Sequence, residues 1–303
     1  MIPPSGEQFE ISFGDQRATV VEVGGGIRSY AVGERPVLDP YPREAMCDGA
    51  HGAPLIPWPN RLADGRYSCD GVEYQLALTE PERGNAIHGL LRWRNWAALE
   101  RASDRVVMAI RLHPMTGWPF LLEVSVDYSL ADDGLTVETR ARNAGRAPCP
   151  FGSGQHPYLS PGAGLVDECI LEVTAATRIL VDEQRQLPVG REPVDGTEFD
   201  FRSPRRIGPL QADHAFADLE RDGDGLAWIT LTGPDGLTAG LWCDEAYPFL
   251  QLYSGDTLAP ERRRRGLGAE PMTCPANALQ SGEGVVRLEP GETFASRWGV
   301  RLS

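Results

Sequence analysis

Strict alternation of apolar and polar residues between positions 122 and 142 is the feature that most constrains the fold. One face of the first half consists of Leu122, Val124, Val126, Tyr128 and Leu130. After Ala131-Asp132-Asp133-Gly134, the same face continues with Leu135, Val137, Thr139 and Ala141. A period of two residues is typical of a β-strand with one buried face, and a short turn containing glycine joins antiparallel strands. The pattern therefore predicts an antiparallel hairpin.

Two further segments repeat this pattern. Residues 227–242 read AWITLTGPDGLTAGLW, in which Pro234-Asp235-Gly236 supplies a turn between two alternating runs. The last residues alternate as well, with Phe294, Ser296, Trp298, Val300 and Leu302 on one face. No segment carries a helical apolar period over three turns, and 34 glycines with 25 prolines suit many turns. We therefore expect an all-β fold: a large antiparallel β-sandwich with few short helices, forming one domain over residues 1–303.

The charged residues exclude several classes of function. The net charge is −14, and all 29 basic residues are arginine. Without lysine there can be no Schiff base on a lysine amine and no Walker lysine. An acidic chain is a poor match for nucleic acid or for an anionic membrane surface, so we expect neither as a partner. One local exception is the run of four arginines at 262–265.

The absence of certain sequence motifs leads to expectations about cellular location and metal binding. The first residues carry neither a basic region nor an apolar run, and no stretch approaches the roughly 18 apolar residues that span a bilayer. The six cysteines are scattered without a C-x-x-C pair. We therefore expect a cytoplasmic protein with reduced cysteines. The histidines lack the spacing of a metal site, so we expect no metal and no cofactor.

The remaining candidates suit neutral acid–base chemistry or simple binding. Motifs for an activated serine, a P-loop or a dinucleotide fingerprint are absent. His88 and His156 lie in glycine- and proline-rich loops, and aromatic residues such as Trp58, Trp93 and Tyr158 accompany nearby polar side chains. Aromatic rings beside hydrogen-bonding groups fit a sugar, which offers a C–H face and a rim of hydroxyls, although we expect at least half of the tryptophans to be core residues.

An ordered set of short motifs resembles the aldose 1-epimerase (galactose mutarotase-like) family. The motifs are Asn60-Arg61 followed by DGRYSCDGVEYQL, IHG at 87–89, QHPYL at 155–159, DHAF at 213–216, PFLQLYSGD at 248–256 and AEPMTCPANAL at 269–279. The resemblance covers roughly residues 20 to 302. It implies a large β-supersandwich with a sugar cleft on one sheet, which agrees with the strand pattern.

The resemblance also implies roles for individual residues. Glu270 would be the general base and His156 the general acid of a reaction that interconverts the α and β anomers of an aldohexose. Arg61, His88, Asp213 and Gln251 would hold the sugar hydroxyls, with Asn60 beside them. We expect Glu270 to be ionised near pH 7, and we expect Asp213 to raise the pKa of His156 and favour its charged form.

Three alternatives remain open at this stage. A hexose-6-phosphate 1-epimerase on the same scaffold would use the arginines at 262–265, or Arg92 and Arg94, to bind phosphate. A non-catalytic sugar-binding protein would retain the same residues without turnover. A glycosidase would need Glu270 and a second carboxylate such as Asp213 at a suitable separation. The assembly is expected to be a monomer or a homodimer.

Overall fold

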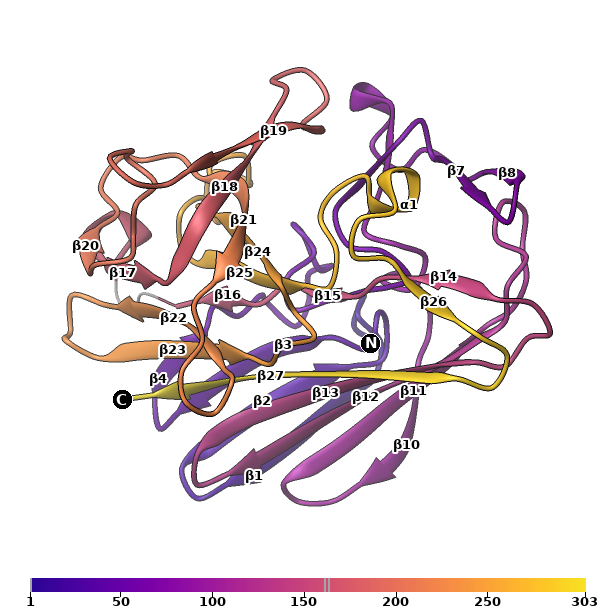
Figure 1. Cartoon of the computed structure of the whole chain (residues 1–303). Helices are drawn as coiled ribbons and strands as arrows, with labels where there is room; N and C mark the ends of the chain where they lie inside the picture. The colour runs from indigo at the N-terminus through magenta and orange to yellow at the C-terminus, as the bar shows by residue number, and fades with distance from the viewer. Residues whose placement is uncertain (1, 161, 163) are drawn as a thin grey trace.

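The computed structural model describes residues 2–160, 162 and 164–303, and strands dominate it. Two large sheets contain most of them (Figure 1). The first sheet has the order β1 (Gln8–Phe13), β2 (Gln16–Val21), β3 (Ile27–Val32), β4 (Arg35–Leu38), β16 (Tyr158–Leu159), β25 (Leu267–Met272), β24 (Phe249–Tyr253), β21 (Asp213–Leu219), β18 (Ala175–Val181), β19 (Pro188–Pro193). In addition, β15 (Gly154–Gln155) pairs with β25 and with β5 (Pro54–Leu55).

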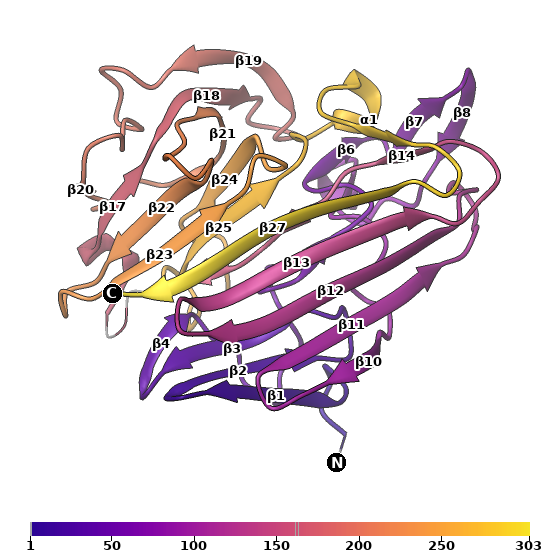
Figure 2. The same ribbon diagram turned by 60° about the horizontal axis from the view of Figure 1, so that its bottom comes forward.

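The second sheet contains the segments with the clearest alternation. Its order is β10 (Ala97–Arg101), β11 (Arg105–Leu112), β12 (Leu122–Ala131), β13 (Gly134–Asn143), β27 (Thr293–Leu302), β23 (Thr238–Cys243), β22 (Ala227–Thr232), β17 (Ile170–Val173), β20 (Arg205–Arg206). Both predicted hairpins are confirmed, as β12–β13 and β22–β23. The C-terminal strand β27 pairs with β13 on one side and β23 on the other, which joins the two hairpins (Figure 2).

The remaining elements are small. Three two-stranded sheets pair β14 (Cys149–Phe151) with β26 (Val286–Leu288), β6 (Arg61–Ala63) with β9 (Asn85–Ile87), and β7 (Arg66–Cys69) with β8 (Val72–Gln75). Helical structure is limited to α1 (Ala278–Ser281) and two 3₁₀ turns, η1 (Pro81–Arg83) and η2 (Val166–Glu168). The all-β prediction with few short helices is therefore confirmed. In the described part of the chain, no helix has the length and apolar character needed to cross a membrane.

One hydrophobic cluster draws side chains from both large sheets. The predicted inward faces of β12 and β13 are buried, and Trp298 of β27 packs with them. On the first sheet, Leu250 and Leu252 of β24 belong to the same cluster. Because side chains alternate along a strand, the residues between and after them, Gln251 and Tyr253, point to the opposite face of this sheet. That opposite face carries the polar residues described next.

Candidate active site

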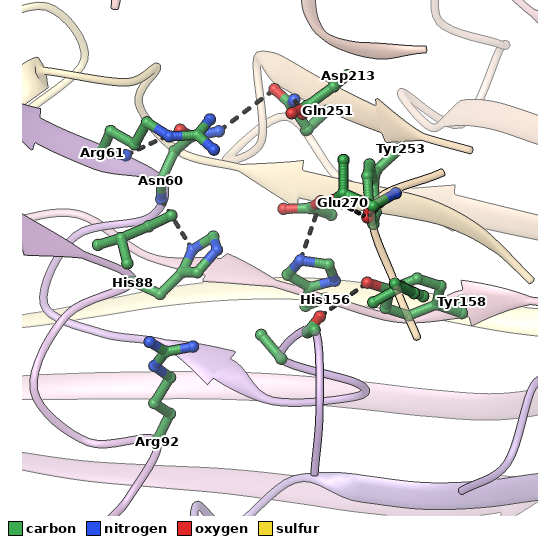
Figure 3. Close-up of a pocket in the computed structure, with 15 residues that line it drawn as sticks. Asn60, Arg61, His88, Arg92, His156, Tyr158, Asp213, Gln251, Tyr253 and Glu270 are labelled. Carbon is green, nitrogen blue, oxygen red and sulfur yellow. Dashed lines mark hydrogen bonds and ion pairs between the residues drawn. The ribbon is translucent and has the colours of Figure 1, made fainter. Parts of the chain in front are cut away.

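A cavity of about 320 Å³ lies against the first sheet and is lined by all seven residues that the sequence singled out (Figure 3). These are Asn60, Arg61, His88, His156, Asp213, Gln251 and Glu270. Residues that are separated by more than 200 positions in the chain thus meet at one place. Their chemical roles stay predictions, but their proximity is a property of the structure.

Three neighbouring strands present the residues at the back of the cavity. In the β24–β25 pair, Gln251 lies directly opposite Glu270, and in the β21–β24 pair Asp213 lies opposite Tyr253. Residues opposite one another in a sheet share a face, and positions two apart along a strand do so as well. The strand register therefore places a glutamate, a glutamine, an aspartate and a tyrosine on the same face.

His156 lies in the short link between β15 and β16 and contacts Glu270 directly. Its N–H donates to the carbonyl of Ala53 at 3.1 Å, and its carbonyl accepts from the N–H of Gly52 at 2.9 Å. Its Nε2 lies 3.2 Å from Oε1 of Glu270. His156 is 5% exposed and Glu270 is 2% exposed. The two groups therefore form a proton-sharing pair that is almost removed from water.

Asn60 and His88 also line the cavity, and both have left-handed backbone conformations, with φ of 56° and 62°. The N–H of Asn60 donates to Nδ1 of His88 at 3.2 Å, and the N–H of His88 donates to the carbonyl of Asn60 at 3.0 Å. Because Nδ1 accepts a hydrogen bond, Nε2 of the neutral ring carries the proton. The next residue must be a glycine, Gly89, because a Cβ at this position would lie 2.0 Å from the carbonyl oxygen of Ile56.

A row of hydrogen bonds orders the polar rim. Nδ2 of Asn60 donates to Oε1 of Gln251 at 3.3 Å, and Nε2 of Gln251 donates to Oδ1 of Asp213 at 2.6 Å. Arg61 is fixed by Glu80, whose carboxylate accepts from Nε at 3.0 Å and from Nη2 at 3.1 Å. These side chains therefore present oriented donors and acceptors next to one another along the cavity, which is the arrangement that a polyhydroxylated ligand needs.

The protonation states differ from those expected from the sequence. Burial lowers the pKa of His156 to about 3, with the nearby His51 lowering it further. Burial raises the pKa of Glu270 well above its ordinary value, and the charge of Asp213 raises it further. The expectation that Asp213 favours a charged His156 is therefore wrong, since Asp213 acts on Glu270 instead. Both shifts favour the neutral groups, so burial favours a state in which the pair holds one proton and that proton is on Glu270.

The arginine run does not reach the cavity. None of the four residues lines it. Arg262 donates to Asp39 at 2.7 Å, and Arg264 donates to Asp167 at 2.7 Å and to Asp256 at 2.8 Å. The buried Arg264 and the partly buried Arg262 are thus held by carboxylates of the folded chain, whereas Arg263 and Arg265 are exposed. The idea that the run binds a substrate phosphate is therefore incorrect.

The cavity also contains an arginine and two tyrosines to which the sequence had assigned no definite place in the site. Arg92 lines it four positions after His88, whereas Arg94 is exposed and lies near Met115. Tyr158 and Tyr253 supply its aromatic surface. The family motifs identified the polar residues on the strands. They did not show that the side chain of Arg92, but not that of Arg94, faces the cavity, because this depends on the conformation of the loop after His88.

The tryptophans expected near the site lie elsewhere. Trp58, Trp96 and Trp118 are buried in the core, as expected for at least half of the set, and Trp93 is 47% exposed. The described residues contain no cluster of three or more His, Cys, Asp or Glu suited to a metal ion. All six cysteines are free thiols.

The sequence and fold were compared with known proteins. A family model described as aldose 1-epimerase matches residues 7–301. The uncharacterized protein YihR of Escherichia coli strain K12 is 37% identical over 290 residues, covering 95% of this chain and 91% of its own. Aldose 1-epimerase of the same strain is 29% identical over 240 residues, covering 73% and 66% of the two chains. A crystal structure of a GalM/aldose epimerase homologue from C. elegans superposes with a TM-score of 0.86 at 19% identity and covers 98% of each chain, which supports the fold.

The raised pKa of Glu270 predicts a pH-dependent stability. A carboxyl group with a raised pKa in the folded state ionises more readily after unfolding, so its contribution becomes unfavourable as pH rises above its ordinary value of 4.5. Glu270→Gln removes this titration with little change in shape. We expect its melting temperature to exceed that of the wild type by about 2 °C or more near pH 7.5, and by less near pH 5.

Thermal unfolding at the two pH values measures this difference. The exposed Glu34→Gln variant is the matched control and should follow the wild type. A Glu270→Gln protein that is less stable than the wild type near neutral pH would instead indicate a stabilising Glu270–His156 ion pair.

Proposed function

The chain belongs to the aldose 1-epimerase family, and we propose that it interconverts the α and β anomers of an aldohexose by acid–base ring opening. The observation that carries the proposal is the 3.2 Å contact between His156 and Glu270 inside a cavity lined by hydrogen-bonding groups. Anomer exchange needs one group that accepts a proton and one that donates it. It needs no redox step and no covalent adduct, which suits the residues present.

Ring opening begins with the proton of the pair on His156. Glu270 takes the proton of the C1 hydroxyl while His156 donates its proton to the ring oxygen, and the C1–O5 bond breaks to give the open-chain aldehyde. Rotation about C1–C2 presents the other carbonyl face. Closure reverses both transfers, since Glu270 returns a proton to O1 and His156 takes the proton of the C5 hydroxyl. The pair holds one proton before and after the cycle.

Burial favours the protonation states that follow ring opening over those that precede it. In the free site it favours a neutral histidine and a protonated glutamate, which are the protonation states that follow ring opening. A proton must therefore cross from Glu270 to His156 before the ring form reacts, and their direct contact supplies the path. The step that opens the ring then returns the pair to its neutral form, so the free energy spent in forming the buried ion pair is regained in that step.

The other residues are suited to holding the sugar in place. The Nε2–H of His88 and the guanidinium of Arg61 are donors, the carboxylate of Asp213 is an acceptor, and the amide groups of Asn60 and Gln251 are already oriented by their mutual bond. Hydrogen bonds that fix the ring bring C1 and O5 to the reacting pair, and such positioning lowers the barrier.

Removing either member of the pair should abolish most of the activity. A positioned proton donor or acceptor contributes about 10²–10⁴-fold, so we expect Glu270→Ala and His156→Ala each to lower kcat by at least about 10²-fold. Polarimetry of freshly dissolved α-D-glucose and α-D-galactose measures the rate. His113→Ala, at the exposed end of β11, is the control histidine variant and should keep full activity.

The results also separate the other classes of function. Full activity in a folded Glu270→Ala or His156→Ala protein would remove that residue from the mechanism. Sugar binding by the wild type without faster mutarotation would identify a binding protein, and release of a sugar from a glycoside would identify a glycosidase.

One observation favours an aldose with an anionic group as a second candidate substrate. The guanidinium of Arg92 lines the cavity, yet within the described residues it makes no hydrogen bond or ion pair, and burial lowers its pKa. Arg61, by contrast, is neutralised by Glu80. The charge of Arg92 also lowers the pKa of both His88 and His156, so it acts on both histidines of the cavity. In this second candidate, C6 of the bound sugar faces Arg92. A phosphate or carboxylate at C6 would then meet an unpaired cation.

This second candidate predicts a charge-selective effect at Arg92. Arg92→Ala should lower kcat/KM for glucose 6-phosphate by about tenfold or more, because a charge-assisted pair is lost, and should change kcat/KM for glucose much less. Arg94→Ala, two residues away and exposed, should affect neither. Equal losses for both sugars, or a wild type that prefers glucose, would leave the neutral aldohexose as the substrate.

A further inference from the structure

Behind the cavity, three aromatic rings form a column that ends on His156. The ring of His51 lies flat against that of Tyr158, with centroids 3.6 Å apart and planes 3° from parallel. Tyr158 in turn stacks on His156, with centroids 5.0 Å apart and an angle of 16°. Figure 3 shows Tyr158 and His156 side by side in the cavity wall. His51 is buried and does not line the cavity.

The column packs against one face of the His156 ring. A catalytic histidine is usually oriented by a hydrogen bond to its second ring nitrogen. Here Nδ1 of His156 is buried and has no hydrogen-bond partner among the described residues. The remaining contacts of the ring are the stack with Tyr158, an edge contact with His88 at 5.3 Å, and Nε2 against Glu270. With no partner at Nδ1, the direction in which Nε2 points is set by packing on the ring together with the contact to Glu270.

His51 is itself held by a partly buried polar cluster. Its Nδ1 lies 3.1 Å from the carbonyl oxygen of Asp48, and its Nε2 lies 3.1 Å from Oδ2 of Asp39. Arg262 donates to the same Asp39 oxygen at 2.7 Å and to the carbonyl of Pro40 at 2.8 Å. Its Nη2 also lies 3.0 Å from Nε2 of His51. The first arginine of the run thus holds the far end of the column.

We propose that His51 is a positioning residue: acting through Tyr158, it holds the imidazole plane of His156. Asp39 and Arg262 act in turn on His51. The kinetic consequences rest on the proposed epimerase activity, whereas the structural coupling does not. A ring face at position 51 is what the column requires, and the polar cluster keeps that face in place.

Two substitutions test the ring at position 51. His51→Ala removes the ring, and His51→Phe keeps its face but not its contacts with Asp39, Asp48 and Arg262. Since a misplacement of about 1 Å can cost about 10²-fold, we expect His51→Ala to lower kcat about tenfold or more with KM within about twofold, and His51→Phe to have a kcat between those of His51→Ala and the wild type. A purely structural role would give two variants whose activities simply follow their melting temperatures.

The arginine run supplies a matched pair for the next step. Arg262→Ala should lower kcat in the same way as His51→Ala, and the double variant should be no slower than His51→Ala alone, because Arg262 acts through His51. Arg264→Ala is the control, since Arg264 is also buried and bound to carboxylates but lies outside the column. It should lower stability without lowering kcat. Additive losses from His51→Ala and Arg262→Ala would contradict the order of action.

A measurement without substrate tests the coupling on its own. In ¹³C-histidine-labelled protein, the Cε1–Hε1 signal of His156 is identified by its loss in His156→Ala, and its shift reports the Tyr158 ring stacked on it. We expect His51→Ala and Arg262→Ala to move or broaden this signal beyond the difference between wild type and Arg264→Ala, and His51→Phe to move it less than His51→Ala does. An unmoved signal in folded His51→Ala overturns the proposal, whatever the activity. A displaced signal in an enzyme that turns over no aldose would contradict the proposed function and leave the coupling standing.

Discussion

The contact between Nε2 of His156 and Oε1 of Glu270 brings two titratable groups together where almost no water reaches them. In water each group would hold its ordinary charge. In this cavity, burial lowers the pKa of one and raises that of the other, so a single proton belongs to the pair. A shared proton suits a reaction that takes a proton from one oxygen and returns one to another without net change.

The rest of the fold keeps this contact in place. Opposite positions on β24 and β25 present Gln251 beside Glu270, while apolar residues on the other face of the same strands are buried in the core. His156 is held at its backbone by the loop of residues 52 and 53 and at its ring by Tyr158. The sheet therefore fixes the carboxyl group, and loops with their own buried polar clusters fix the imidazole.

The sequence predicted the parts of the fold that depend on local pattern. The hairpins at 122–143 and 227–243 follow from alternation and turn residues, and both form as expected. The strands β5, β15 and β16 have only two residues each and are defined by partners far along the chain, so no local period could reveal them. The cavity residues were found through family motifs, which identify residues but not their surroundings.

The two expectations that the structure contradicts, on the charge of His156 and on the arginine run, failed for the same reason. The protonation of His156 and Glu270 depends on burial, and the arginine run depends on Asp39, Asp167 and Asp256, which lie between 8 and 223 positions away. Neither the depth of a group nor its partner across a sheet is written in a segment of sequence. Charge patterns therefore indicated a phosphate site where the folded chain instead pairs Arg262 and Arg264 with its own carboxylates.

The pH dependence of kcat/KM for a neutral aldose tests the one-proton pair most directly, after subtraction of spontaneous mutarotation. With the pKa of His156 lowered to about 3, its ring takes up no second proton in the mildly acidic and neutral range, and burial favours the remaining proton on Glu270. We predict a rate that stays constant within about twofold between about pH 5 and about pH 7. A break near 6.5, the ordinary pKa of histidine, would contradict the account.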